Sequence, residues 1–213
     1  MQILSHRGYW LKPEQKNTQV AFEHSFALGF GTETDVRDYQ GKLVISHDIA
    51  TKNSISLEEF LTLYKKYSAD LPLALNIKAD GLQENLKSEL KYFDIENYFV
   101  FDMSVPDGLM YLKAGLKTFT RQSEYEKQPS FYEEASGVWL DEFHSHWIDL
   151  NVIKQHLQHG KRVCIVSPDL HKRDHLFEWQ HYKDIITYLD YDVSNLMICT
   201  DYPEEARRFF YDN

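Results

Sequence analysis

The chain has 213 residues, of which 43% are hydrophobic and 15% aromatic, and this is enough for a packed core. We therefore predict one globular domain over residues 1–213. The formal net charge of -10 argues against a nucleic-acid-binding protein, because a surface that follows a phosphate backbone needs a basic stripe. An anionic ligand is expected to meet a local cluster of cations or a metal.

The sequence contains no run of about eighteen apolar residues, so we expect no membrane-spanning segment. Residues 1–5 run directly into the first motif and leave no room for a signal peptide. Cys164 and Cys199 each lie in an apolar strand-like run without metal-ligand spacing, which predicts buried free thiols. We expect a cytoplasmic protein, and no pattern indicates its oligomeric state.

Short apolar runs alternate with amphipathic stretches along the whole chain, which is typical of βα units around a parallel sheet. The runs predict eight strands, the second of which has a continuation at residues 43–46. In chain order the strands are predicted at residues 3–5, 31–36, 73–77, 98–102, 116–120, 137–141, 162–166 and 196–200.

Helices are predicted between these strands. Residues 18–28 carry apolar side chains at helical spacing, and Gly29 follows as a C-terminal stop. Ser56 precedes Glu59 by three residues, a capping pattern that predicts a helix beginning there. Further helices are predicted at residues 83–92, 106–113, 149–158, 174–189 and 203–211, with a short candidate at residues 130–135.

Eight strands that are each followed by a helix predict a (β/α)8 TIM barrel. The alternative is a doubly wound open sheet, which would not readily bring the ends of so many strands to one site. In a barrel the active site lies at the carboxyl ends of the strands. Polar residues that end apolar runs are therefore the candidate site residues.

Glu33 and Asp35 are two positions apart on the second predicted strand, so their side chains share one face. Two carboxylates inside a barrel repel each other unless a positive group lies between them. One divalent cation, Mg²⁺ or Ca²⁺, would supply that charge and polarise a phosphoryl oxygen. The alternatives are a solvated strand, or carboxylates paired with Arg7 and Lys78. We favour the cation because Arg7 and Lys78 suit a phosphate better.

Two histidines lie at predicted strand ends close to these groups. His6 precedes Arg7, and His47 precedes Asp48. Two imidazoles beside one anionic centre can share the work of general acid and general base near neutral pH. His146 belongs to a different pattern, His144-Ser145-His146, which lacks the carboxylate or third histidine that a metal site needs, so we expect a packed loop there.

Several short motifs occur in a fixed order from the first predicted strand to the last. They are His6-Arg7-Gly8, Asn17-Thr18, Ala21-Phe22, Gly29, Glu33-Thr34-Asp35-Val36, His47-Asp48, Asn76-Ile77-Lys78 and Thr200-Asp201-Tyr202-Pro203. This ordered set resembles the glycerophosphodiester phosphodiesterase family, one of the phosphatidylinositol-phospholipase-C-like phosphodiesterase barrels. Each piece alone is weak, but the order of the whole set is specific.

The resemblance implies roles residue by residue. The catalytic histidines of the family fall on His6 and His47, its phosphate-holding arginine on Arg7, and its third-strand lysine on Lys78. The first two metal carboxylates fall on Glu33 and Asp35.

Asn76 departs from the family pattern, which has a glutamate as third metal ligand at this position. An asparagine carbonyl can still bind Mg²⁺ or Ca²⁺, but one negative charge is lost, so cation affinity should fall or another carboxylate should contribute. Asp102 and Asp141, which end later predicted strands, are the candidates for that contribution.

The alcohol part of the substrate is expected to be bound by other strand ends. Family members that hydrolyse glycerophosphodiesters commonly carry an insertion after the second strand, whereas here residues 48–55 lead almost directly to Ser56. We therefore expect a more open pocket. Arg121 and Asp141 are the candidate substrate-binding residues among the later strand ends.

Together these features predict a metal-dependent phosphoric diester hydrolase that acts on a glycerophosphodiester or a similar small phosphodiester. A cyclising phospholipase of the same superfamily is one alternative, but it would need a membrane-facing rim, and no basic amphipathic helix is evident. The other alternative is a catalytically silent barrel that binds a phosphorylated ligand, with Asn76 as the mark of a lost metal. The presence of both histidines and both carboxylates argues against it.

Overall fold

The structure is a computed structural model that describes residues 1–67, 70–189 and 191–212. Its chain divides into two compact units. The N-terminal unit is Ser5–Thr118, and the C-terminal unit combines Met1–Leu4 with Phe119–Asn213. The chain passes from one unit to the other within β1 (Gln2–His6). The expected single domain over residues 1–213 stays a prediction.

The N-terminal unit contains a parallel sheet in which β4 (Leu73–Ile77) lies between β2 (Gly31–Tyr39) and β5 (Tyr98–Phe101). All five residues of β4 are buried, as expected for a strand covered on both faces. β3 (Lys42–Ile45) runs antiparallel to the end of β2, so these two strands form a hairpin. β2 is longer than predicted, and β3 is a separate strand where the sequence predicted a continuation of the second strand at residues 43–46.

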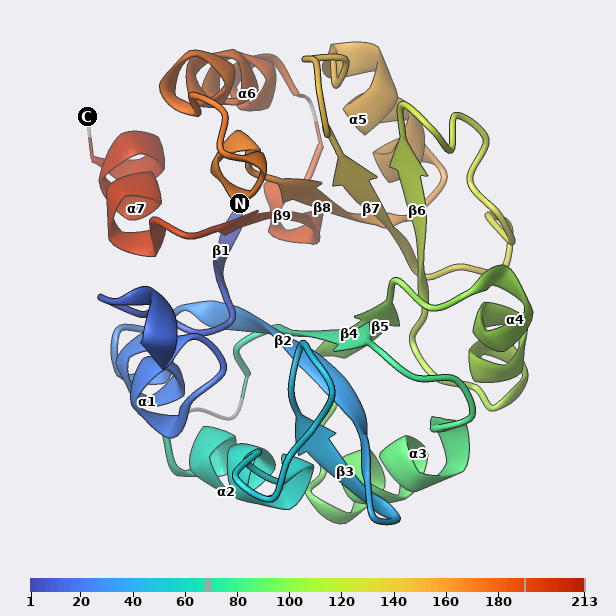
Figure 1. Cartoon of the computed structure of the whole chain (residues 1–213). Coiled ribbons are helices and arrows are strands. Elements are labelled where there is room, and N and C mark those ends of the chain that lie inside the picture. The colour runs from blue at the N-terminus through green and yellow to red at the C-terminus, as the bar shows by residue number, and fades with distance from the viewer. Residues whose placement is uncertain (68–69, 190, 213) are drawn as a thin grey trace. The chain divides into compact units, whose positions relative to one another are not determined.

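Among its described residues this unit has four α-helices, and Figure 1 shows α1 and α2 side by side. Aromatic side chains join these two helices, with the ring centroids of Phe22 and Phe60 4.7 Å apart. Both rings are fully buried in an apolar cluster that also includes Val36 of β2 and Leu75 of β4. The helices are α1 (Gln19–Ala27), α2 (Leu57–Tyr67), α3 (Gln83–Tyr92) and α4 (Val105–Lys113).

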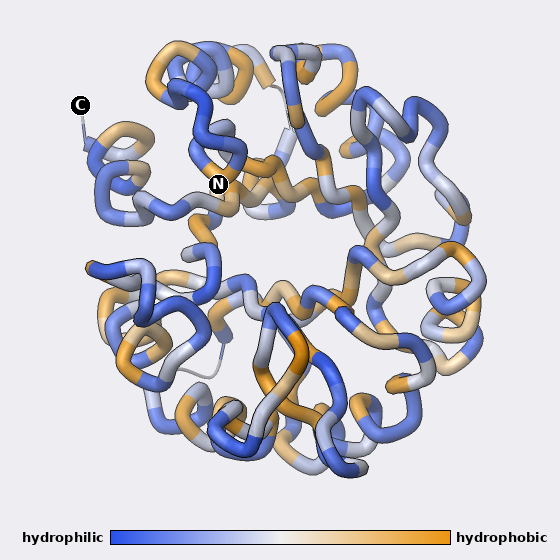
Figure 2. Tube along the Cα trace, in the orientation of Figure 1, coloured by the Kyte–Doolittle hydropathy of each residue, from blue (hydrophilic) through white to orange (hydrophobic). Residues whose placement is uncertain are grey.

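The C-terminal unit contains four parallel strands in the order β9, β8, β7, β6. Every residue of β7 and β9 is buried, and Figure 2 shows the apolar character of β8 and β9. Cys164 and Cys199 lie in these strands as buried free thiols, as predicted. The strands are β6 (Phe119–Ser123), β7 (Gly137–Asp141), β8 (Arg162–Val166) and β9 (Leu196–Thr200).

The helices of this unit pack through aromatic side chains. Trp179 is fully buried, donates its indole N–H to Ser167 Oγ over 2.8 Å, and contacts the rings of Phe209 and Phe210. This contact joins α6 to α7. The helices are α5 (Leu150–Gln158), α6 (Leu176–Tyr188) and α7 (Pro203–Tyr211). None of the described helices has both the length and the apolarity needed to cross a membrane.

Two predicted elements differ from the structure. The strand expected at residues 116–120 begins at Phe119, because Thr118 forms an isolated bridge with Val100 before the regular pairing starts. The helix expected at residues 130–135 is wrong. Phe131 has a φ of 43°, which an α-helix does not accommodate, and the segment consists of turns.

Candidate functional site

The loop after β1 begins with two residues of positive φ, Arg7 at 59° and Gly8 at 81°. At the second position a Cβ atom would lie 2.8 Å from the backbone of Ala21, so no larger residue fits without movement. The Gly8 N–H donates to Thr32 Oγ1 over 3.1 Å. The loop is thus held against both α1 and β2.

Arg7 contacts Glu33 through its backbone and Asp35 through its side chain. Its N–H donates to the carbonyl oxygen of Glu33 over 2.9 Å and lies 3.2 Å from Glu33 Oε2. Its guanidinium Nε lies 3.0 Å from Asp35 Oδ2. The left-handed conformation of one residue therefore places a cation beside the predicted metal ligands.

Asn17 also holds the site together, and sequence reasoning gave it no role of its own. Its amide Nδ2 donates to Asp35 Oδ2 over 2.8 Å, and its Oδ1 accepts a hydrogen bond from Thr34 over 2.9 Å. A φ of 58° and a hydrogen bond from its N–H to the Arg7 carbonyl set this geometry. Asparagine tolerates the left-handed region better than most residues. An asparagine in this loop was therefore the sequence signal that could have pointed to Asn17.

Glu33 and Asp35 are 2% and 0% exposed, and their side chains lie on the same face of β2, as the spacing predicted. Burial raises the pKa of Glu33 to about 7, and the negative charge of Asp35 acts in the same direction. The positive charges of His6, Arg7 and Lys78 act against this shift. His6 Nε2 lies 3.9 Å from Glu33 Oε2. An added positive charge would therefore be favourable here.

Asn76 lies directly beside Asp35, because these two residues are register partners in the parallel pair β2 and β4. Asn76 is 9% exposed, and neither its Oδ1 nor Asp35 Oδ1 accepts a hydrogen bond from the described residues. Buried oxygens are normally satisfied, and carboxylate and amide oxygens are the ligands of hard divalent cations. These oxygens, together with Glu33, fit a bound Mg²⁺ or Ca²⁺.

Lys78 lies between two carboxylates. Its Nζ is 3.5 Å from Asp35 Oδ1 and 3.3 Å from Asp102 Oδ2. The sequence suggested Asp102 as a compensating metal ligand, and in the structure it forms an ion pair with this lysine. Arg7 and Lys78 thus flank Asp35. This pairing of a carboxylate with both cations is the arrangement named above as the alternative to a bound metal.

His47 follows β3, and the N–H of the preceding Ser46 donates to the carbonyl oxygen of Asp35 over 2.9 Å. The imidazole Nδ1 of His47 lies 2.9 Å from Asp48 Oδ1, and the side chain is 46% exposed. A carboxylate on one ring nitrogen orients the ring and leaves the other nitrogen for proton transfer.

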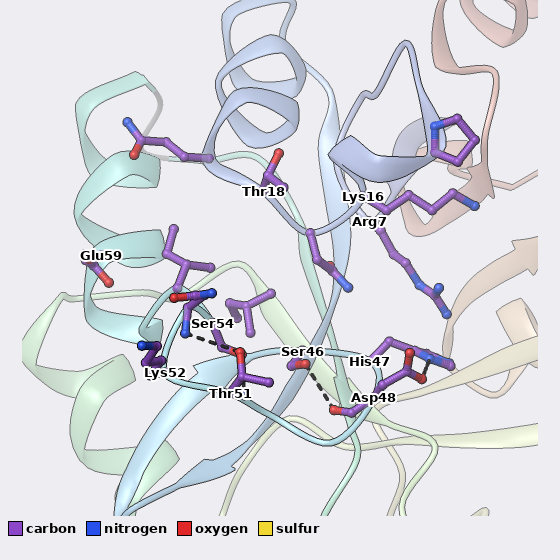
Figure 3. Close-up of a pocket in the computed structure, with 16 residues that line it drawn as sticks. Arg7, Lys16, Thr18, Ser46, His47, Asp48, Thr51, Lys52, Ser54 and Glu59 are labelled. Atoms are coloured by element: carbon purple, nitrogen blue, oxygen red, sulfur yellow. Dashed lines mark hydrogen bonds and ion pairs between the residues drawn. The ribbon is translucent and has the colours of Figure 1, made fainter.

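A cavity of about 760 Å³ lies beside Arg7 and His47, as Figure 3 shows. One wall is the loop after β1, with Lys16, Asn17 and Thr18, and the other is the short segment after His47. Most of the lining side chains are polar or charged, which suits a hydrophilic ligand. The cavity lies wholly within the N-terminal unit.

Arg121 and Asp141, the predicted substrate-binding residues, belong to the C-terminal unit. Arg121 lies on β6, where its Nε pairs with the carboxylate of Glu126. Asp141 ends β7 and lies 2.6 Å from His171 Nε2. Both side chains are thus held by contacts within their own unit, and their role in substrate binding stays a prediction.

No family model and no curated protein matches the sequence. Among solved structures, a glycerophosphodiester phosphodiesterase from Agrobacterium tumefaciens has a TM-score of 0.69 at 14% identity, covering 99% of this chain and 98% of its own. A phosphodiesterase from Oleispira antarctica, in complex with the product sn-glycerol-3-phosphate, has a TM-score of 0.66 at 17% identity, with 98% and 96% covered.

The chain has the fold of the glycerophosphodiester phosphodiesterases. A Ca²⁺-dependent phosphatidylinositol-specific phospholipase C from Streptomyces antibioticus is also similar, with a TM-score of 0.56 at 8% identity and 98% and 95% of the two chains covered. The predicted α/β class and (β/α)8 barrel fold are therefore confirmed. At such identities the likeness extends to the fold alone, so the roles of individual residues rest on the geometry described above.

Proposed function

We propose that the chain is a phosphoric diester hydrolase that acts on a glycerophosphodiester or a similar small phosphodiester. The observation that carries this proposal is the buried pair Glu33 and Asp35, flanked by Arg7 and Lys78 and adjoining His6. Acidic ligands, phosphate-binding cations and a proton-transfer group are the parts that metal-assisted hydrolysis of a phosphodiester needs.

Glu33, Asp35 and Asn76 would hold one divalent cation, Mg²⁺ or Ca²⁺. When bound, the cation would neutralise the two carboxylates and polarise a non-bridging phosphate oxygen. The support is that the Oδ1 atoms of Asp35 and Asn76 accept no hydrogen bond from the described residues, and that the pKa of Glu33 is raised. The Ca²⁺ dependence named for the similar phospholipase supports the same class of metal.

Arg7 and Lys78 would bind the phosphate and stabilise the charge that develops on it. Both cations now compensate Asp35, so they already point toward the predicted cation site. A guanidinium suits phosphate oxygens because it presents several N–H donors in a fixed plane.

His6 and His47 would act as general acid and general base. One imidazole takes the proton of the nucleophile, which is water or a hydroxyl of the substrate, and the other gives a proton to the leaving alkoxide. Asp48 would orient His47, since its carboxylate lies on Nδ1. If a substrate hydroxyl attacks, a cyclic phosphate forms first.

The product named for the Oleispira phosphodiesterase, sn-glycerol-3-phosphate, supports a small phosphodiester as substrate. The polar cavity beside Arg7 and His47 would accept the hydrophilic part of this substrate.

The proposal is tested by assaying the purified chain with Mg²⁺, Ca²⁺ or Mn²⁺ against a chromogenic diester, glycerophosphodiesters and lysophospholipids. We expect turnover that needs the metal, and a loss of about 10²-fold or more in kcat for His6→Ala and His47→Ala. His24→Ala, a histidine of α1 outside the cavity lining, is the matched control and should keep wild-type activity.

Full activity in His6→Ala and His47→Ala would show that the mechanism is wrong. Absence of turnover on the whole panel, with retained binding of glycerol phosphate, would instead support the catalytically silent barrel.

A further inference from the structure

A second group of potential metal ligands lies in the C-terminal unit, formed by Glu142, His146 and Glu178. Glu142 directly follows β7, His146 lies in the loop before α5, and Glu178 lies in the first turn of α6. One ligand atom from each residue lies within 4.8 Å of the other two. Glu142 precedes His146 by four residues, and the fold adds Glu178, which is remote in the sequence.

The distances suit a small cation. His146 Nδ1 lies 3.1 Å from Glu142 Oε1 and 4.0 Å from Glu178 Oε2. Ligand atoms at about 2.1 Å from a tetrahedral Zn²⁺ are about 3.4 Å apart, a value between these two distances. Small side-chain rotations would thus bring all three atoms to one ion.

One of the ligand atoms is buried and accepts no hydrogen bond from the described residues. Glu178 is 5% exposed, and its Oε2 accepts no hydrogen bond from any residue that the structure describes, although it faces His146. Its other oxygen is held by the guanidinium of Arg173, so the free oxygen is fixed in direction. An unsatisfied buried carboxylate oxygen is unfavourable unless a cation or a proton completes it.

Glu142 is held in position by its own hydrogen bonds. Its Oε1 accepts from the backbone N–H groups of Trp147 and Ile148, and its Oε2 accepts from Tyr182 over 2.8 Å. The carboxylate is fully buried, so two buried carboxylates face one imidazole with a single guanidinium beside them. The carboxylates outnumber the guanidinium, so an added cation would be electrostatically favourable here.

We propose that Glu142, His146 and Glu178 bind a divalent cation of the zinc type. An imidazole ligand favours Zn²⁺ over Mg²⁺ or Ca²⁺, which prefer oxygen alone. The side chain of His146 is 24% exposed, so a water molecule can complete the coordination from the solvent side. The ion would tie the loop after β7 to α6 and have a structural role, independent of the proposed hydrolysis.

The test measures zinc binding to the full chain after treatment with a chelator, in excess Mg²⁺ to occupy the other predicted site. Isothermal titration and elemental analysis should give one zinc ion per chain in the wild type and none in His146→Asn. Near saturation, zinc should raise the midpoint of thermal unfolding by about 5 °C in the wild type. His146→Asn should show no such shift.

His144→Asn is the matched control, because this exposed histidine lies in the same loop and pairs with Tyr125 instead of the carboxylates. It should bind zinc as the wild type does. Glu178→Gln serves as the second variant, and circular dichroism establishes that each variant is folded. Absence of zinc from the wild type, or equal binding in wild type, His146→Asn and Glu178→Gln, would overturn the proposal.

Discussion

At Asn76 a neutral amide stands where the family that the sequence resembles has a carboxylate. The residue is buried beside Asp35 with an unsatisfied oxygen, so in the proposed cation site it would contribute a ligand atom without charge. Because cation affinity rises with the number of charged ligands, Asn76→Glu should bind Mg²⁺ or Ca²⁺ about tenfold more tightly. Calorimetric titration measures this change.

The matched control for that substitution is Asn85→Glu, which adds the same charge at an exposed position of α3. It should leave the affinity unchanged. Unchanged or weaker binding by Asn76→Glu would remove Asn76 from the set of cation ligands.

His156 predicts a pH dependence of stability. It is 4% exposed and lies 2.8 Å from both Tyr132 OH and Gln122 Oε1, and burial lowers its pKa to about 4. In the unfolded chain the imidazole takes up a proton below about pH 6.5. Folding therefore loses stability as pH falls from about 6.5 to about 4, by at most about 3 kcal/mol from this residue.

Urea unfolding of wild type and His156→Gln at pH 7.5 and pH 4 measures this contribution. The free energy of unfolding should fall less for the variant than for the wild type. His24→Gln should behave as the wild type, and a wild-type-like loss in His156→Gln would contradict the assignment.

The loop after β1 is the element on which the proposed site depends most. Gly8→Ala would place a methyl group 2.8 Å from the backbone of Ala21 at a φ of 81°. The conformation alone costs about 1–2 kcal/mol in a residue with a side chain, and the collision adds to it. We expect a loss of about 3 kcal/mol or more in the free energy of unfolding, measured with urea.

Gly81→Ala is the control, because it measures the cost of a positive φ in alanine without a steric collision. Gly81 has a φ of 84°, but an added Cβ there meets nothing within 4 Å. The loss should be about 1–2 kcal/mol. Equal losses at the two positions would show that the contact with Ala21 is unimportant.

Local patterns predicted the elements where local forces decide them. The capping pair at the start of α2 is confirmed, since Ser56 N–H donates to Glu59 over 2.8 Å and the Glu59 N–H donates back to Ser56 Oγ. The period of two correctly put Glu33 and Asp35 on one face. The role of Asn17 and the turns around Phe131 depend on backbone conformations that no periodic pattern encodes.

For the whole molecule, the order of the apolar runs was enough to predict the barrel class, because burial of alternating strands and helices permits few architectures. Groups that meet only through tertiary structure were harder to foresee. A packed loop was expected at His146 because its local pattern indicated no metal site, and Glu178, which lies beside it, is remote in the sequence. Pairing of Asp102 with Lys78 was missed for the same reason.

Cation binding should stabilise the whole chain if the ion binds the folded state alone. We expect Mg²⁺ well above its dissociation constant to raise the midpoint of thermal unfolding by a few degrees, and a chelator to reverse the shift. Glu33→Gln should lose this response, whereas Glu14→Gln, at an exposed position, should keep it. Differential scanning calorimetry measures the shift, and an equal response in both variants would contradict the predicted ligand set.

The segment between His47 and the cap of α2 is anchored at its ends and bonded mainly to itself. Ile45 N–H donates to Ile55 over 2.8 Å, and the bonds of residues 51–54 stay within the segment. Such a closed surface loop tolerates added length at little entropic cost. It is therefore a natural insertion point for loop grafting, where new substrate preferences can be engineered while the capped helix and the carboxylate pair stay unchanged.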